Sequence, residues 1–157
     1  MEFYHASKMA LPIGEEIRSG VVSLYYEEAT EALDSNRPES APARKTALYS
    51  ADSLEFAFYF LIKQNVCKSA INLYKVKVKH PWKAVFSIPH IVQRRIEEGK
   101  NIVTLINEYW EPTKNWQFYE YLSTSFVVIE QMDHPVIFDF EMKMKGLRDH
   151  ELADQFS

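Results

Sequence analysis

The chain has 157 residues, a length typical of one domain with a substantial core. Apolar residues make up 46% of it and charged residues 25%, which is ordinary for a globular protein. The net charge of -4 gives no basic footprint for nucleic acid, and the sequence contains no glycine-rich phosphate-binding loop. Cys67 is the single cysteine, which excludes a disulfide framework and a paired-cysteine metal site.

No apolar run approaches the ~20 residues that cross a bilayer, and the N-terminal residues carry no secretory pattern. These features predict a cytoplasmic protein without a membrane partner. Residues 75–79 alternate lysine with valine, which is typical of the solvated face of a strand. We therefore expect no nucleic-acid partner at this basic segment.

Hydrophobic periodicity predicts the elements of the N-terminal part. Residues 2–6 form a short strand, residues 11–17 a turn with alternating apolar anchors, and residues 25–33 a helix. Residues 34–44, which include Pro38 and Pro42, form a loop. This loop is a candidate flap over a ligand, although a plain surface connection is the more ordinary role.

The remaining elements alternate between strands and helices. Residues 47–51 form a strand, followed by a helix at 54–63 that Asp52 and Ser53 cap. Because that helix is apolar nearly all round, we expect it to be buried. A strand at 70–79 precedes helices at 89–98, which Pro89 opens and Gly99 closes, and at 102–109. Strands at 116–122, 125–130 and 136–140 complete the predicted α+β fold, and the polar tail 146–157 is expected to fray.

Three polar residues, His5, Tyr49 and Glu120, stand out from apolar surroundings. Taken singly, each has a structural explanation: a satisfied histidine, a core tyrosine and a glutamate on the outward side of an edge strand. His5 and Ser7 are two residues apart, so their side chains point to one face of the predicted strand. The order of the three residues along the chain, with the segments around them, indicates a ligand site.

These segments resemble the motifs of the ADP-ribosyltransferase superfamily. Residues 3–7, FYHAS, resemble the first motif of the diphtheria-toxin-like branch, and look nearest to the small rifampin-modifying enzymes. Residues 47–51, ALYSA, resemble the second motif, and residues 73–78, LYKVKV, the strand that follows it. Glu120 stands where the glutamate of the third motif is expected. The resemblance extends to about residue 130 and is carried by the order and spacing of short motifs.

The resemblance implies a split antiparallel β core with flanking helices and NAD bound in the cleft between its halves. It implies that His5 hydrogen-bonds a ribose of NAD and that the backbone of the first motif, including Ala6 and Ser7, pairs with the carboxamide. Tyr49 would stack against the flat cationic nicotinamide ring, and Tyr59 could close its other side.

Two further assignments complete the implied site. Arg44 is a candidate phosphate contact, with an ordinary solvated arginine as the alternative. Glu120 is the candidate catalytic carboxylate, because cleavage of the nicotinamide–ribose bond develops an oxocarbenium-like cation. The fallback carboxylates are Glu108, Glu111 and Glu130.

The predicted function is a mono-ADP-ribosyltransferase that uses NAD and no metal, and modifies an unidentified protein or small molecule. Two positions depart from the family pattern. Ala6 replaces the glycine that usually follows the histidine, and Phe118 stands where arginine-modifying members carry Gln or Glu. An arginine acceptor is therefore not supported.

Three alternatives remain open. The first is an NAD glycohydrolase with the same site, and the second is a non-catalytic protein-interaction module on the same fold. The aromatic residues Trp82, Trp110 and Trp116 would suit such a module. The third, the RNA 2'-phosphotransferase branch, is disfavoured because it needs several converging arginines and the sequence offers only Arg94 and Arg95 on one helix.

Overall fold

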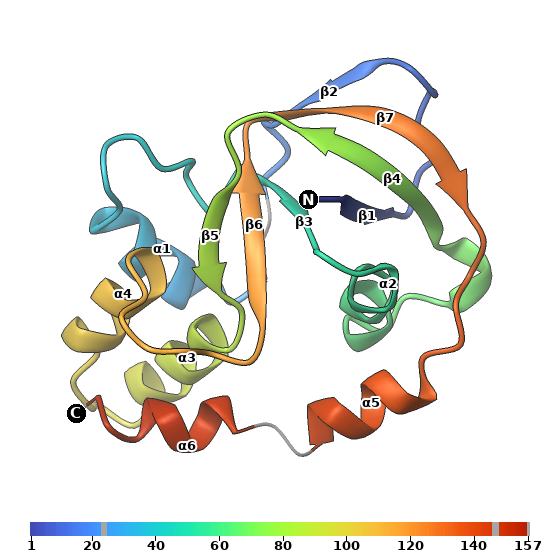
Figure 1. Ribbon diagram of the computed structural model, residues 1–157. Coiled ribbons are helices and arrows are strands. Elements are labelled where there is room, and N and C mark those ends of the chain that lie inside the picture. The colour runs from blue at the N-terminus through green and yellow to red at the C-terminus, as the bar shows by residue number, and fades with distance from the viewer. Residues whose placement is uncertain (23–24, 146–147, 157) are drawn as a thin grey trace. The chain divides into compact units, whose positions relative to one another are not determined.

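The computed structural model describes residues 1–22, 25–145 and 148–156, which form an α+β protein with antiparallel sheets (Figure 1). Two compact units are present, and each is assembled from three segments of the chain. Unit 1 comprises Met1–Ser19, Leu48–Pro81 and Ser123–Gly146, and unit 2 comprises Gly20–Ala47, Trp82–Leu122 and Leu147–Ser157. The α+β class is confirmed, whereas the single-domain organisation and the split ADP-ribosyltransferase-like core stay predictions.

Unit 1 is built on a four-stranded antiparallel sheet in the order β1-β4-β7-β2 (Figure 1). Its strands are β1 (Phe3–Ser7), β2 (Glu16–Arg18), β4 (Asn72–Val78) and β7 (Ser125–Met132). In β4 the predicted alternation holds at Val76, which is buried, and Lys77, which is exposed, but not at Leu73 and Tyr74, which are both buried. A register shift against β7 falls between Lys75 and Val76.

The helix α2 (Leu54–Lys63) packs against β1 and β4, and its bounds agree with the prediction (Figure 1). The Ser53 side chain accepts a hydrogen bond from the Phe56 N–H at 3.2 Å, so the predicted N-cap is confirmed. Burial is less complete than expected, because only Phe56, Ala57 and Phe58 of this helix are buried. The remaining apolar side chains of the helix keep partial exposure.

The short strand β3 (Leu48–Ser50) precedes α2 and lies beside β1. Tyr4 and Ala51 exchange two backbone hydrogen bonds, each 2.9 Å long. The sequence prediction of a strand at 47–51 is therefore confirmed, and the first two motifs become neighbours in space. A single turn of 3₁₀ helix, Lys68–Ala70, leads from α2 to β4.

The strand predicted at 136–140 is wrong, because the chain there enters the helix α5 (Phe138–Lys145). Phe140 packs against Phe56 at 5.4 Å and Tyr59 at 5.4 Å between ring centroids. Ile137 is buried and Phe140 follows three residues later, a spacing that places both on one face of a helical turn. Tertiary packing on α2 therefore overrides the short alternating pattern.

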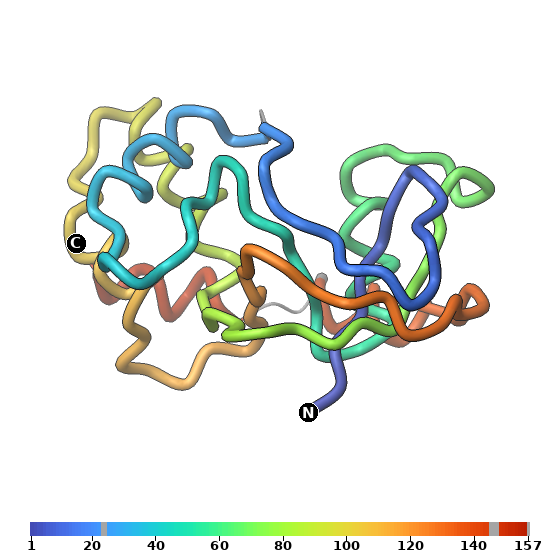
Figure 2. Tube along the Cα trace, turned by 90° about the horizontal axis from the view of Figure 1, so that it is seen from above, coloured from blue at the N-terminus to red at the C-terminus, as the bar shows by residue number. Residues whose placement is uncertain are grey.

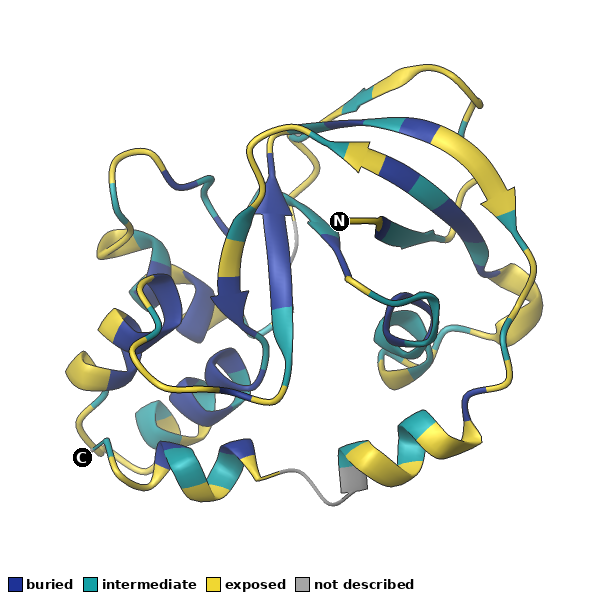
Figure 3. Ribbon diagram, viewed as in Figure 1, coloured by how far each residue is buried: buried dark blue, intermediate teal, exposed yellow. Residues whose placement is uncertain are grey.

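Unit 2 contains the helices α1 (Glu27–Ser35), α3 (Ile88–Glu97) and α4 (Val103–Trp110), which bury apolar faces against one another (Figure 3). All three lie close to their predicted positions, and Gly99 follows α3 with a φ of 69°. The strand β5 (Trp82–Val85), which the sequence analysis did not predict, pairs antiparallel with β6 (Tyr119–Ser123). The loop after α1 runs from residue 36 to residue 47, so the loop predicted at 34–44 is confirmed in position but starts and ends later than expected (Figure 2).

The polar tail contains a short helix where the structure describes it, and the predicted fraying stays a prediction. This helix is α6 (Asp149–Ala153), and Asp149 accepts hydrogen bonds from the backbone N–H groups of Gln117 and Phe118. The Arg95 side chain also donates to the Ala153 and Phe156 carbonyl oxygens. Gly146, Leu147 and Ser157 lie outside the described residues. Within the described residues, no helix is both long and apolar enough to cross a bilayer.

Candidate functional site

The first two motifs meet at the side chain of His5 in unit 1. The His5 Nδ1 lies 2.6 Å from the Tyr49 carbonyl oxygen, although the two residues are 44 positions apart. The ring also packs against Phe126 of β7, with 4.8 Å between ring centroids. The imidazole therefore has a fixed position, set by β3 on one side and the sheet on the other.

This environment determines the charge and tautomer of His5. Burial lowers the pKa of the imidazole below its ordinary 6.5, and the hydrogen bond to the Tyr49 carbonyl opposes this effect only in part. The ring is therefore neutral at pH 7. Because a carbonyl oxygen can only accept, Nδ1 must carry the proton, which makes Nε2 a hydrogen-bond acceptor.

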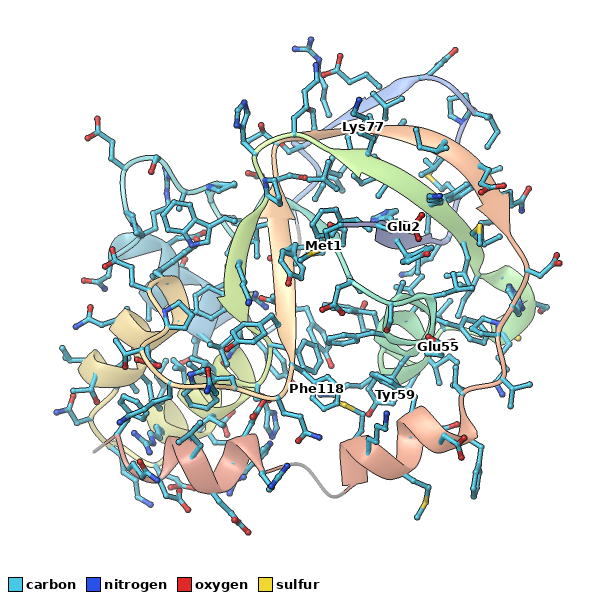
Figure 4. All side chains as sticks on the ribbon, viewed as in Figure 1. Met1, Glu2, Glu55, Tyr59, Lys77 and Phe118 are labelled. Carbon is cyan, nitrogen blue, oxygen red and sulfur yellow. The ribbon has the colours of Figure 1, made fainter. Side chains whose placement is uncertain are left out.

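The other nucleotide-binding candidates of unit 1 lie on β1, β3 and α2. The Ser7 hydroxyl accepts a hydrogen bond from the Met9 N–H at 3.0 Å, so it supports the turn after β1. The Tyr49 ring is half-buried and lies 6.2 Å from the Phe60 ring. Tyr59 is also half-buried and projects from α2 toward α5, where it contacts Phe140 (Figure 4). Ala6 pairs with Leu73 of β4.

Glu120 lies on β6 in unit 2 and is only 1% exposed. The alternative of a glutamate on an outward, solvated face is therefore wrong. Its Oε2 accepts a hydrogen bond from the Tyr109 hydroxyl at 2.5 Å and forms an ion pair with the Arg44 guanidinium. The catalytic role of Glu120 stays a prediction, but the structure establishes that this carboxylate belongs to a buried hydrogen-bonded network.

Arg44 is 6% exposed, so the alternative of an ordinary solvated arginine is also wrong. Its Nη1 donates to the Tyr109 hydroxyl at 2.8 Å and its Nε to the Thr30 hydroxyl at 3.2 Å. The guanidinium also lies 5.6 Å from the centroid of the Tyr109 ring. The partners that the structure gives to Arg44 are thus protein groups of α1, α4 and β6, which sequence reasoning did not foresee.

The backbone of Arg44 is held as firmly as its side chain. The Asp34 carboxylate accepts from the Arg44 N–H at 2.7 Å and from the Lys45 N–H at 3.0 Å. Asp34 and Arg44 are the first and last residues of the predicted 34–44 loop, so this carboxylate joins the two ends of the loop. Ala41, in the middle of this loop, is buried and adds a further anchor.

The fallback carboxylates have different environments. Glu108 is buried and accepts hydrogen bonds from the Trp116 indole, the Thr113 hydroxyl and N–H, and the Lys114 N–H. Burial raises the pKa of Glu108, but these bonds together bring it below its ordinary 4.5. Glu111 and Glu130 are exposed. Glu108 therefore stabilises the turn after α4, and these hydrogen bonds come from groups of the protein.

The tryptophans cited for an interaction module, and one arginine cited for the phosphotransferase branch, make structural contacts in unit 2. Trp110 and Trp116 are buried, and the Trp110 indole donates to the Leu33 carbonyl at 2.8 Å. The Trp82 indole donates to the Trp110 carbonyl at 3.0 Å. Trp110 and Trp116 thus belong to the core, whereas Trp82 is half-buried. Arg95 binds carbonyl oxygens of the C-terminal segment, as described above.

The described residues bring no group of three His, Cys, Asp or Glu side chains close enough to hold a metal ion. No protein-family model matches the chain, and a search of curated proteins finds no relative.

Proposed function

We propose that the protein is an NAD-dependent mono-ADP-ribosyltransferase. The observation that carries this proposal is the contact between His5 and Tyr49, the central residues of the first two motifs. Two short motifs that resemble one superfamily, and that are 44 positions apart, lie against each other in unit 1. If the resemblance of either motif were accidental, there would be no reason to expect the two segments to be neighbours in the fold.

His5 suits the recognition of a ribose hydroxyl. A neutral imidazole with its proton on Nδ1 accepts a hydrogen bond at Nε2, and ribose hydroxyl groups can donate one. The half-buried Tyr49 ring supplies an aromatic face for the nicotinamide, whose positive charge favours such a contact. Tyr59, Ala6 and Ser7 are assigned to the same nucleotide, and Tyr59 would act through its ring.

Glu120 is assigned to the chemical step. The bond between the nicotinamide nitrogen and the ribose carbon breaks, and its electron pair leaves with neutral nicotinamide. Positive charge develops on the ribose, and a carboxylate at the 2'-hydroxyl stabilises that charge more in the transition state than in the ground state. The acceptor then forms a bond to the ribose carbon and loses a proton. When water is the acceptor, the same residues perform NAD hydrolysis.

The experiment is release of nicotinamide from NAD at millimolar concentration, with labelled ADP-ribose followed in parallel. We expect wild-type protein to release nicotinamide, and Glu120→Gln to lower the rate by about 100-fold, the scale of losing one electrostatic group in a transition state. Glu97→Gln, an exposed carboxylate of α3, is the matched control and should keep the wild-type rate.

The label identifies the acceptor class. Labelled protein or small molecule indicates transfer, whereas free ADP-ribose alone indicates hydrolysis. The proposal is refuted if wild-type protein releases no nicotinamide, or if it releases nicotinamide at the same rate as Glu120→Gln. In either case, thermal denaturation with and without NAD tests whether the fold binds the nucleotide without chemistry.

A further inference from the structure

We propose that Tyr109 and Arg44 are positioning residues for the Glu120 carboxylate, an inference that rests on the proposed function. Both side chains donate to the same oxygen, Oε2, and they come from different elements. Tyr109 belongs to α4, Arg44 to the end of the 34–44 loop, and Glu120 to β6. The carboxylate is therefore oriented by two groups that lie 11 and 76 positions away in sequence.

The donors are themselves held in place. Thr30 of α1 accepts from the Arg44 Nε, and its own hydroxyl donates to the Tyr25 carbonyl at 3.3 Å. Asp34 holds the Arg44 backbone. The Tyr109 side chain is fully buried and packs edge-on against Trp110, with 4.8 Å between ring centroids. Such a supporting shell allows a carboxylate to keep one orientation without reorganisation during a reaction.

Stability by itself does not account for this arrangement. A buried ion pair has a large desolvation cost, and apolar side chains of similar volume often stabilise a protein as well or better. A network that holds one carboxylate in a fixed orientation is useful where its charge must act on a developing cation. The network therefore supplies the fixed carboxylate that the chemistry assigned to Glu120 would need.

The Tyr109→Phe variant tests this role, since it removes one hydroxyl and keeps the aromatic ring. Tyr119→Phe is the matched control: Tyr119 lies on the same strand as Glu120, and its hydroxyl accepts from the Trp116 N–H at 3.0 Å rather than contacting Glu120. Both variants lose one tyrosine hydroxyl with a protein partner. The readouts are kcat and KM for nicotinamide release, measured well below the melting temperature of each variant.

We expect Tyr109→Phe to lower kcat at least about tenfold with KM within about threefold, because the lost bond acts on the transition state. Tyr119→Phe should keep kcat within about twofold. Arg44→Lys retains the charge but not the planar guanidinium with its several donors. It should lower kcat by a larger factor than it changes KM.

Equal kcat values for Tyr109→Phe and Tyr119→Phe would overturn the positioning role while leaving the proposed function in place, provided that Glu120→Gln releases nicotinamide about 100-fold more slowly than wild type. Loss of the proposed function has a separate signature, namely that wild-type protein and Glu120→Gln release nicotinamide equally or not at all. That result would overturn the positioning role as well.

Discussion

Replacement of Arg44 by methionine should destabilise the protein strongly, because it leaves the Glu120 carboxylate without its cation. Both side chains are nearly inaccessible, with 7% and 2% of their surfaces exposed. Removing one partner of a buried ion pair typically costs about 3–5 kcal/mol, since the remaining charge stays buried without compensation. Against a total stability of roughly 5–15 kcal/mol for a domain, this loss is large.

A double-mutant cycle separates the ion pair from packing effects. Glu120→Gln should likewise cost about 3–5 kcal/mol, because it leaves the Arg44 guanidinium buried without its counter-charge. The double variant Arg44→Met/Glu120→Gln removes both charges of the pair. Its loss of stability should therefore be about 2 kcal/mol smaller than the sum of the two single losses. The assay is urea unfolding at equilibrium, followed by tryptophan fluorescence and circular dichroism.

The control for this cycle is Arg18→Met, because Arg18 pairs with Glu16 at 3.8 Å on the surface with 80% of its side chain exposed. Pairs of this kind contribute little in water, so no measurable loss is expected there. The reasoning is refuted if Arg44→Met is as stable as Arg18→Met, or if the single losses in the cycle add without coupling.

Three further predictions concern local features. Burial lowers the pKa of His5, so the unfolded chain takes up a proton before the folded one as the pH falls through about 6.5. Protonation then favours the unfolded state. Between about pH 7 and 5, the unfolding free energy of wild type should therefore fall more steeply than that of His5→Gln. Ser53→Ala should cost about 1 kcal/mol in urea unfolding through loss of the α2 cap, and no change would contradict the Phe56 hydrogen bond. Asp34→Ala should speed protease cleavage within residues 36–44, and an unchanged cleavage rate would show that other contacts hold the ends of the loop.

Local sequence determined most of the helices and strands. Ser53 and the apolar run behind it define α2 to the residue, because a cap and a hydrophobic stripe act within one or two turns. Pro89 and Gly99 bracket α3 for the same reason. Motif order along the chain was also sufficient to single out His5 and Tyr49, which the structure brings into contact.

Tertiary structure alone decided the surroundings of the charged residues. Arg44 contacts partners 65 and 76 positions away, and no local pattern encodes which side chains will meet across such distances. The same limit applies to residues 136–140, where a short alternating run became α5 because Phe140 packs on α2. Periodicity and capping are properties of neighbouring residues, whereas the environment of Glu120 depends on α1, α4, β6 and the 34–44 loop folding together.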